Sequence, residues 1–127
     1  MSFKEYDEYD AIGLAELVKK KEVSAEELLN EAIQRTKKVN GQTNAVVLKH
    51  YDEAKAMIEK GLPEGPFTGV PYLLKDLHVL LTGTKTTYGS KFFKDYVADH
   101  NSTLVDRYLE AGLVIFGKTN SPEFGLT

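Results

Sequence analysis

Residues 112 to 120 read GLVIFGKTN, and this stretch decides between two kinds of α/β protein. It fits the phosphate-loop pattern, in which a Gly and four further residues precede Gly-Lys-Thr. In such a loop a strand comes before the first glycine, and the four intervening residues wrap a phosphate with their N–H groups. Here an expected helix comes before Gly112, and Leu113 to Phe116 are apolar like a buried strand. The stretch therefore predicts a strand of a sheet and argues against a nucleotide site.

The flanking sequence extends this α/β prediction. Ser102 and Thr103 can begin a helix through Leu109 that Gly112 ends, directly before the apolar strand. A helix followed by an apolar strand indicates a sheet with some parallel pairing. Residues 70 to 81 are nearly all apolar and predict another strand, buried on both faces.

The first half of the chain has the signals of helices. Asp10 can cap a helix running to about Lys20. The capping box from Ser24 to Glu27 begins a second helix, whose buried stripe runs from Leu28 to Val39 and which Asn40-Gly41 is expected to end.

A short strand and a third helix complete the first half of the chain, which differs in composition from the second half. Residues 45 to 48 predict the strand, and residues 52 to 60 predict a helix that Gly61 closes. Residues 1 to 64 are thus expected to be mainly helical, whereas residues 65 to 127 hold strands and helices of a sheet core.

Composition narrows the class of protein. The chain has 127 residues, 42% of them hydrophobic and 28% charged, as in an ordinary folded domain. A net charge of -3 gives no positive field for a phosphate backbone, so we expect no nucleic-acid partner. Without a cysteine, a signal-peptide pattern or a long apolar run, the sequence predicts a cytoplasmic protein with no membrane partner.

Lys75 is the candidate catalytic residue. On a straight strand it would share one face with Leu73 and Leu77, while Asp76 points to the other face. A buried ammonium without a partner is costly, and a lysine made neutral in a dry site can act as a general base. The alternative is that Lys75 ends its strand and reaches solvent, or that it pairs with a distant carboxylate.

The remaining polar residues predict no second catalytic group. His78 lies among apolar residues and is interpreted as a core or pocket-wall histidine. His50 and His100 fall in expected loops, the histidines lack metal-ligand spacing, and each serine lies at the terminus, a cap or a turn.

Three ordered blocks carry a family resemblance: GPFTGVPYLLKD, GTKTTYGS and DHNSTLVDRYLEAGLVIFGKTNSPEFG. Together they resemble the N-terminal part of the amidase signature family, whose fold is a mixed β-sheet flanked by helices. The YLLKDL and SPEFGLT segments are most similar to the branch with 6-aminohexanoate cyclic-dimer hydrolase. The A subunit of tRNA-dependent amidotransferase is the second candidate, although Leu77 stands where that branch usually has asparagine.

The resemblance implies an amide hydrolase with a Ser–Ser–Lys triad. In that mechanism the lysine accepts a proton through a bridging serine, and the second serine attacks the carbonyl carbon of a small-molecule amide substrate. Lys75 matches the catalytic lysine of the family motif, and no metal or organic cofactor is implied. Lys118 falls in the Gly-Lys-Thr-Asn block, for which the resemblance suggests either a structural role or a role in supporting the groups around the sheet end, and no catalytic task.

The chain departs from the family pattern in its length. It stops at Thr127, whereas the family's Gly-Ser-rich segment with both serines normally begins several tens of residues later. We therefore expect residues 1 to 127 to be a truncated N-terminal fragment of one amidase domain that is inactive alone. Unpaired strand edges predict that the fragment self-associates. A non-catalytic binding or assembly module remains the other alternative.

Overall fold

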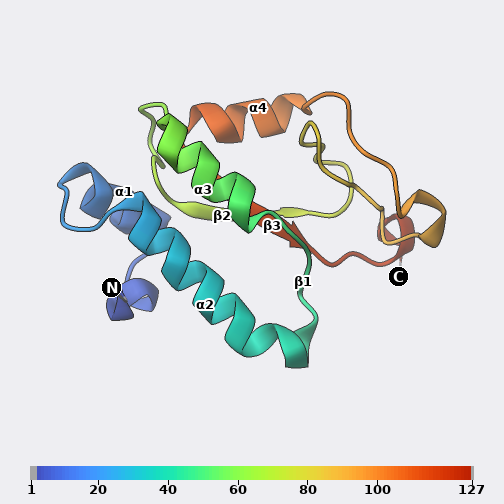
Figure 1. Ribbon diagram of the computed structural model, residues 1–127, viewed down its shortest axis with the longest axis horizontal. Coiled ribbons are helices and arrows are strands. Elements are labelled where there is room, and N and C mark those ends of the chain that lie inside the picture. Colours follow the sequence, from blue (N-terminus) through green and yellow to red (C-terminus); the bar gives the residue numbers. More distant parts are fainter. Residues whose placement is uncertain (1–2, 127) are drawn as a thin grey trace.

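Strand β3 (Val114–Thr119) forms the centre of a three-stranded sheet in the computed structural model, which describes residues 3–126 (Figure 1). Strand β2 (Pro71–Lys75) pairs with it in parallel, and strand β1 (Val46–Lys49) pairs with its other edge in antiparallel fashion. The predicted α/β class with some parallel pairing is confirmed.

Both pairings shift register, the β2 pairing near the middle of β3 and the β1 pairing near its C-terminal end. Against β2, the residues opposite Tyr72 and Leu73 are Ile115 and Gly117, so one residue of β3 is extra. Gly117 also allows β1 to approach closely, because a Cβ there would lie 2.6 Å from the main-chain oxygen of Leu48.

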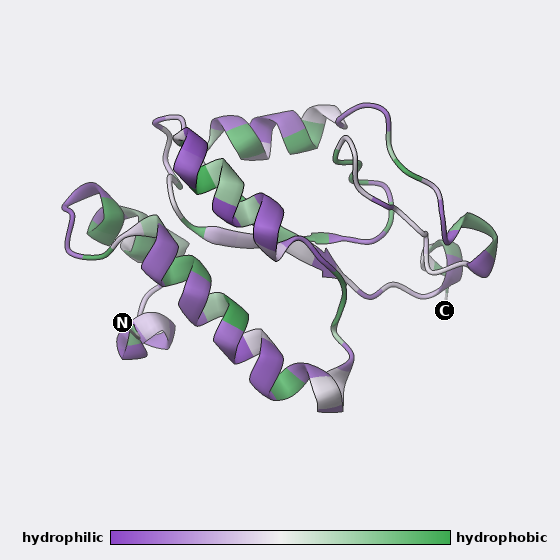
Figure 2. Ribbon diagram, viewed as in Figure 1, coloured by the Kyte–Doolittle hydropathy of each residue, from purple (hydrophilic) through white to green (hydrophobic). Residues whose placement is uncertain are grey.

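Two helices cover one face of the sheet. Helix α2 (Ala25–Thr43) and helix α3 (Tyr51–Lys60) pack against the buried side chains of Val114 and Phe116. Figure 2 shows α2 banded in hydrophobic and hydrophilic residues along its length, as expected for a helix with one buried face. The side of α2 that faces the sheet carries the fully buried Leu29.

Helix α4 (Thr103–Glu110) covers the opposite face. Its Val105 packs with Ile115 of β3 and Leu74 of β2, and each of these side chains is at most 1% exposed. Gly112 follows the helix at φ +90°, close to Thr68, which confirms that this glycine ends α4.

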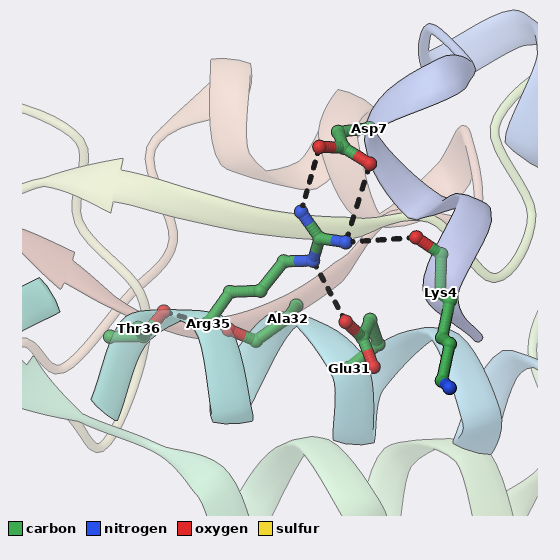
Figure 3. A network of polar contacts seen from close by, with 6 residues as sticks. All are labelled: Lys4, Asp7, Glu31, Ala32, Arg35 and Thr36. Carbon is green, nitrogen blue, oxygen red and sulfur yellow. Dashed lines mark hydrogen bonds and ion pairs between the residues drawn. The ribbon is translucent and has the colours of Figure 1, made fainter. Parts of the chain in front are cut away.

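The N-terminal elements pack beside α2. Helix α1 (Ala11–Lys19) begins with the predicted Asp10 cap, whose carboxylate accepts the N–H of Gly13. The short 3-10 helix η1 (Lys4–Glu8) is held by Arg35 of α2, which binds Glu31, the Lys4 carbonyl and the Asp7 carboxylate (Figure 3). Two more 3-10 turns, η2 (Lys91–Phe93) and η3 (Glu123–Gly125), lie in the loops near the C-terminal end.

The boundaries of two predicted elements were wrong. Helix α2 begins with the predicted capping box but continues through Asn40-Gly41 to Thr43 and ends at Asn44 in a left-handed conformation. It can continue because the Asn40 side chain binds both the N–H and the carbonyl of Val46, which ties the last turns to β1. Val39, expected in the buried stripe, is 49% exposed.

The strand predicted over residues 70 to 81 is limited to Pro71–Lys75 and lies at the edge of the sheet. Its burial on both faces is wrong, because Tyr72 and Leu73 are only partly buried and Lys75 is exposed. Val79 and Leu81 are apolar for another reason, since they pack beside the α4 contact without belonging to a strand.

Candidate functional site

Lys75 is the last residue of β2, at the carboxyl end of the parallel pair. Its side chain is exposed, and its ammonium donates a hydrogen bond to the main-chain oxygen of Asn120 at 2.5 Å. Of the two interpretations that the sequence left open, a buried Lys75 does not hold for this chain. The alternative, in which Lys75 ends its strand and reaches solvent, agrees with the structure.

The buried lysine at this end of the sheet is Lys118, for which the family resemblance suggested a structural or supporting role and no catalytic task. Its side chain is fully buried, and Nζ donates to the carbonyl oxygen of Lys85 and, at 2.9 Å, to the hydroxyl of Thr86. Burial lowers the pKa of Lys118 to about 8, and the nearby Asp76 carboxylate partly opposes this shift. A signal was present in the sequence, because Lys118 follows a strongly apolar strand without a break.

Asp76 is the second buried charge, with a side chain that is 2% exposed. Its carboxylate accepts the N–H of Thr87 at 2.7 Å and also the Thr87 hydroxyl. Lys75 and Asp76 thus point apart as predicted, one toward solvent and one into the protein. The turn that follows Asp76 leads the chain away from the sheet.

Two loops meet beyond this polar end of the sheet. Ser90 donates its hydroxyl proton to the Glu123 carboxylate at 2.9 Å, and the Phe124 N–H donates to the Tyr88 carbonyl at 2.7 Å. Tyr88 and Phe124 both have φ near +55°, a region that side-chain-bearing residues seldom adopt. Such strained residues persist only where the surrounding contacts hold them.

The histidines lie apart from Lys75. His78 is exposed and meets the Tyr88 ring edge-on at 5.6 Å, so of its two interpretations the core histidine is wrong and the pocket-wall histidine stays a prediction. His50 was expected in a loop but is buried at the start of α3, where burial, and then the Lys118 charge, lower its pKa. His100 lies on the surface and binds Asp99. Among residues 3–126 no group of three or more His, Asp or Glu side chains could hold a metal ion.

The serines of the described chain are all engaged in local structure. Ser24 caps α2 and Ser90 binds Glu123, while the Ser102 hydroxyl binds the Leu80 N–H and the His78 carbonyl. The Ser121 hydroxyl donates to the carbonyl of Pro122. Over residues 3–126 none of these hydroxyls is hydrogen-bonded to Lys75; Ser2 lies outside the described residues.

A groove of about 960 Å³ lies between α2 and the strands β1 and β2, lined among others by Gln34, Val39 and Leu73. It does not include Lys75, Asp76 or Lys118. The polar end of the sheet is therefore an assembly of charged residues and loops, separate from this groove.

The mixed sheet flanked by helices has the fold of the N-terminal part of amidase signature structures. The chain matches the solved structure of 6-aminohexanoate cyclic dimer hydrolase with a TM-score of 0.85 and 43% identity, over 91% of this chain and 24% of that one. The family described as Amidase matches residues 27–127. The chain therefore belongs to the Amidase family, as its three sequence blocks predicted.

Two curated relatives show how the similarity is distributed. The chain is 45% identical to the 6-aminohexanoate-cyclic-dimer hydrolase of Paenarthrobacter ureafaciens over 118 residues, which cover 91% of this chain and 24% of that protein. It is 42% identical to the lipoamidase of Enterococcus faecalis over 125 residues, 95% of this chain and 17% of that protein. The chain thus spans about a quarter or less of the length of these relatives.

Proposed function

We propose that this chain is the N-terminal part of an amidase that hydrolyses the C–N bond of small carboxamides. Lys75 is the proton acceptor of a Ser–Ser–Lys triad whose two serines are supplied by residues beyond Thr127. The observation that carries this proposal is the place of Lys75, at the carboxyl end of a strand in a chain of the Amidase family, with an amine that reaches solvent.

The chemistry requires Lys75 to take a proton from the bridging serine, which in turn takes the hydroxyl proton of the second serine as that serine attacks the carbonyl carbon. A base held by a hydrogen bond makes a poor nucleophile competent, and nearby N–H groups stabilise the oxyanion. To accept a proton, the Lys75 amine must be neutral, because an ammonium has no lone pair. One of its N–H groups then donates to the Asn120 carbonyl, and the lone pair on nitrogen is left for the hydroxyl proton of the bridging serine.

The chain alone is proposed to be inactive. Its described serines cap helices or tie loops, and none of them bonds to Lys75. The proposal includes no metal or organic cofactor. The proposal places the protein in the cytoplasm and gives it neither a nucleic-acid partner nor a membrane partner. Within the described chain, no helix is long and apolar enough to span a bilayer.

The fragment is also proposed to self-associate through its sheet. The outer strands β1 and β2 each pair with β3 on one side only, so each leaves an edge of N–H and carbonyl groups. Sedimentation of the 127-residue chain over a range of concentrations is expected to show dimers or larger species. A monomer at the highest concentration would refute the self-association.

The test of the proposed function uses the complete product of the reading frame that contains this chain. That product is expected to hydrolyse a carboxamide, with the cyclic dimer of 6-aminohexanoate and linear amides as the first substrates, whereas residues 1–127 alone show no turnover. Release of ammonia from glutamine would instead favour the amidotransferase branch.

Replacement of Lys75 makes this test specific. Lys75→Ala is expected to lower kcat by about 100-fold or more, the usual contribution of a positioned base. Lys55→Ala, which removes an exposed lysine of α3, serves as the matched control and should leave turnover unchanged. Full activity of the Lys75→Ala protein would refute the proposal.

A further inference from the structure

Two buried charges flank Lys75 without bonding to it. Asp76 is its neighbour in the chain, and Lys118 lies across the sheet opposite Leu74. Both side chains are at least 98% buried. Buried charges of this kind are kept when they hold other groups in place, because burial alone is unfavourable for them.

Both charged groups bind parts of one three-residue segment, Lys85 to Thr87, which is called the 85–87 loop below. Lys118 donates to the Lys85 carbonyl and the Thr86 hydroxyl, and Asp76 accepts the N–H and the hydroxyl of Thr87. Thr86 is completely buried as a result. The 85–87 loop is thus attached to the ends of β2 and β3 by charge-assisted hydrogen bonds, which are stronger than neutral ones.

The residues that follow the 85–87 loop hold the segment after β3. A Cβ on Gly89 would lie 2.3 Å from the Ser121 carbonyl oxygen, so the two backbones are in direct contact. The bonds from Phe124 to Tyr88 and from Ser90 to Glu123 continue this contact. The chain from Ser121 to Phe124 is therefore held by the segment that Asp76 and Lys118 fix.

This held segment begins directly after Asn120, whose carbonyl accepts the Lys75 ammonium. On its other side, Asn120 is bound through its N–H to Ala45 and through its side chain to Asn44. The Asp76 N–H also donates to the Thr119 carbonyl at 3.0 Å. The acceptor of Lys75 thus lies between two fixed points: the residues directly before β1 on one side, and the segment held by residues 88 to 90, directly after the 85–87 loop, on the other.

We propose that Asp76 and Lys118 are positioning residues for Lys75, acting through the 85–87 loop and the Asn120 carbonyl. The proposal rests on the proposed function for the role of Lys75, but the placement of its amine can be measured without catalysis. Loss of either charge releases the 85–87 loop and the segment after β3. The Lys75 amine then loses its fixed acceptor and is more available to reagents.

The test measures trace acetylation of Lys75 in the 127-residue chain by mass spectrometry, with exposed Lys55 as the internal reference. Lys118→Met and Asp76→Asn are each expected to raise the ratio of Lys75 to Lys55 labelling by about fivefold, as expected for loss of one hydrogen bond. Lys85→Met is the matched control, because Lys118 binds the main-chain oxygen of Lys85 and not its side chain. Its labelling ratio should equal that of the wild type.

Two further comparisons distinguish positioning of Lys75 from a general loss of stability: a destabilised control variant, and a conservative substitution that restores the lost hydroxyl. Leu29→Ala destabilises the protein away from this end of the sheet, so its labelling ratio below the unfolding transition should stay that of the wild type. Thr87→Val removes one hydroxyl that binds Asp76 and is expected to raise the ratio, whereas Thr87→Ser restores it. This pair decides the question if Lys118→Met fails to fold.

An unchanged labelling ratio in folded Asp76→Asn and Thr87→Val proteins would overturn the positioning role. That result would leave the proposed amidase function intact, since acetylation requires no turnover. Conversely, a complete gene product without amide hydrolysis would remove the proposed function and leave the measured positioning of Lys75 in place.

Discussion

The helix-covered body of the sheet and its polar carboxyl end are stabilised in different ways. In the body, side chains such as Leu29, Val114 and Ile115 are buried in apolar contacts on both faces of β3. At the carboxyl end, Asp76 and Lys118 are as deeply buried, but each is satisfied by groups of one loop. Apolar burial tolerates any neighbour of the right size, whereas a buried charge requires particular partners.

The largest effect is expected in the body. Leu29→Ala should lower the free energy of unfolding by about 3 to 4 kcal/mol, because it removes a fully buried side chain and leaves a cavity. Denaturant unfolding followed by circular dichroism measures this change. Val39→Ala is the control, because Val39 lies on the same helix but is 49% exposed, and it should lower the free energy of unfolding far less. Equal losses would contradict the assignment of the buried face.

The second effect is a pH dependence that comes from the polar end. Burial lowers the pKa of Lys118 from 10.5 to about 8, so between these values the unfolded chain binds more protons than the folded one. Raising the pH from 8 to 10.5 should therefore stabilise the wild type relative to Lys118→Met, by at most about 3 kcal/mol.

Unfolding curves of both proteins at several pH values give this difference, and the tyrosines and other lysines cancel in it. A wild-type stability that falls relative to Lys118→Met over the same range would show that the Lys118 ammonium is not penalised by burial.

A smaller loss of stability is expected when the capping box at the start of α2 is removed. Ser24 and Glu27 form the capping box, in which each side chain binds the main-chain N–H of the other. Ser24→Ala should cost about 1 kcal/mol, and Ser24→Asp should retain most of the stability. Thermal unfolding of the two variants provides the measurement. A cost for Ser24→Ala as large as that for Leu29→Ala would mean that the helical region depends on polar contacts as much as the sheet end does.

The smallest effect is expected for the Arg35 network, which joins η1 to α2 at the surface (Figure 3). Exposed ion pairs contribute little and are screened by salt. Arg35→Gln should shift the melting temperature only slightly at low salt and not measurably at high salt. A large shift that persists in high salt would place this network among the buried interactions.

Local signals in the sequence were sufficient for most of the fold. The Ser24 capping box, Gly112 and the apolar run after it correctly predicted the start of α2, the end of α4 and the central strand. The strand predicted over residues 70 to 81 was too long because the apolar run continues to Leu81, where burial comes from packing near α4.

The site was predicted only in part. The three family blocks identified Lys75 as a candidate, but its exposure depends on a turn that the apolar pattern conceals. The apolar strand before Lys118 indicates its burial, but its partners could not be derived from the sequence, because Lys85 and Thr86 lie more than 30 residues earlier. The binding of Lys118 and Asp76 to the same loop is a property of the folded chain.

The most direct test of this account compares kcat and KM for amide hydrolysis by the complete gene product in wild-type, Lys75→Met and Lys118→Met forms. We expect Lys75→Met to lower kcat by about 100-fold or more. Lys118→Met should lower kcat less and leave KM close to the wild-type value. Wild-type kcat in a folded Lys75→Met protein would contradict the central claim that Lys75 is the base.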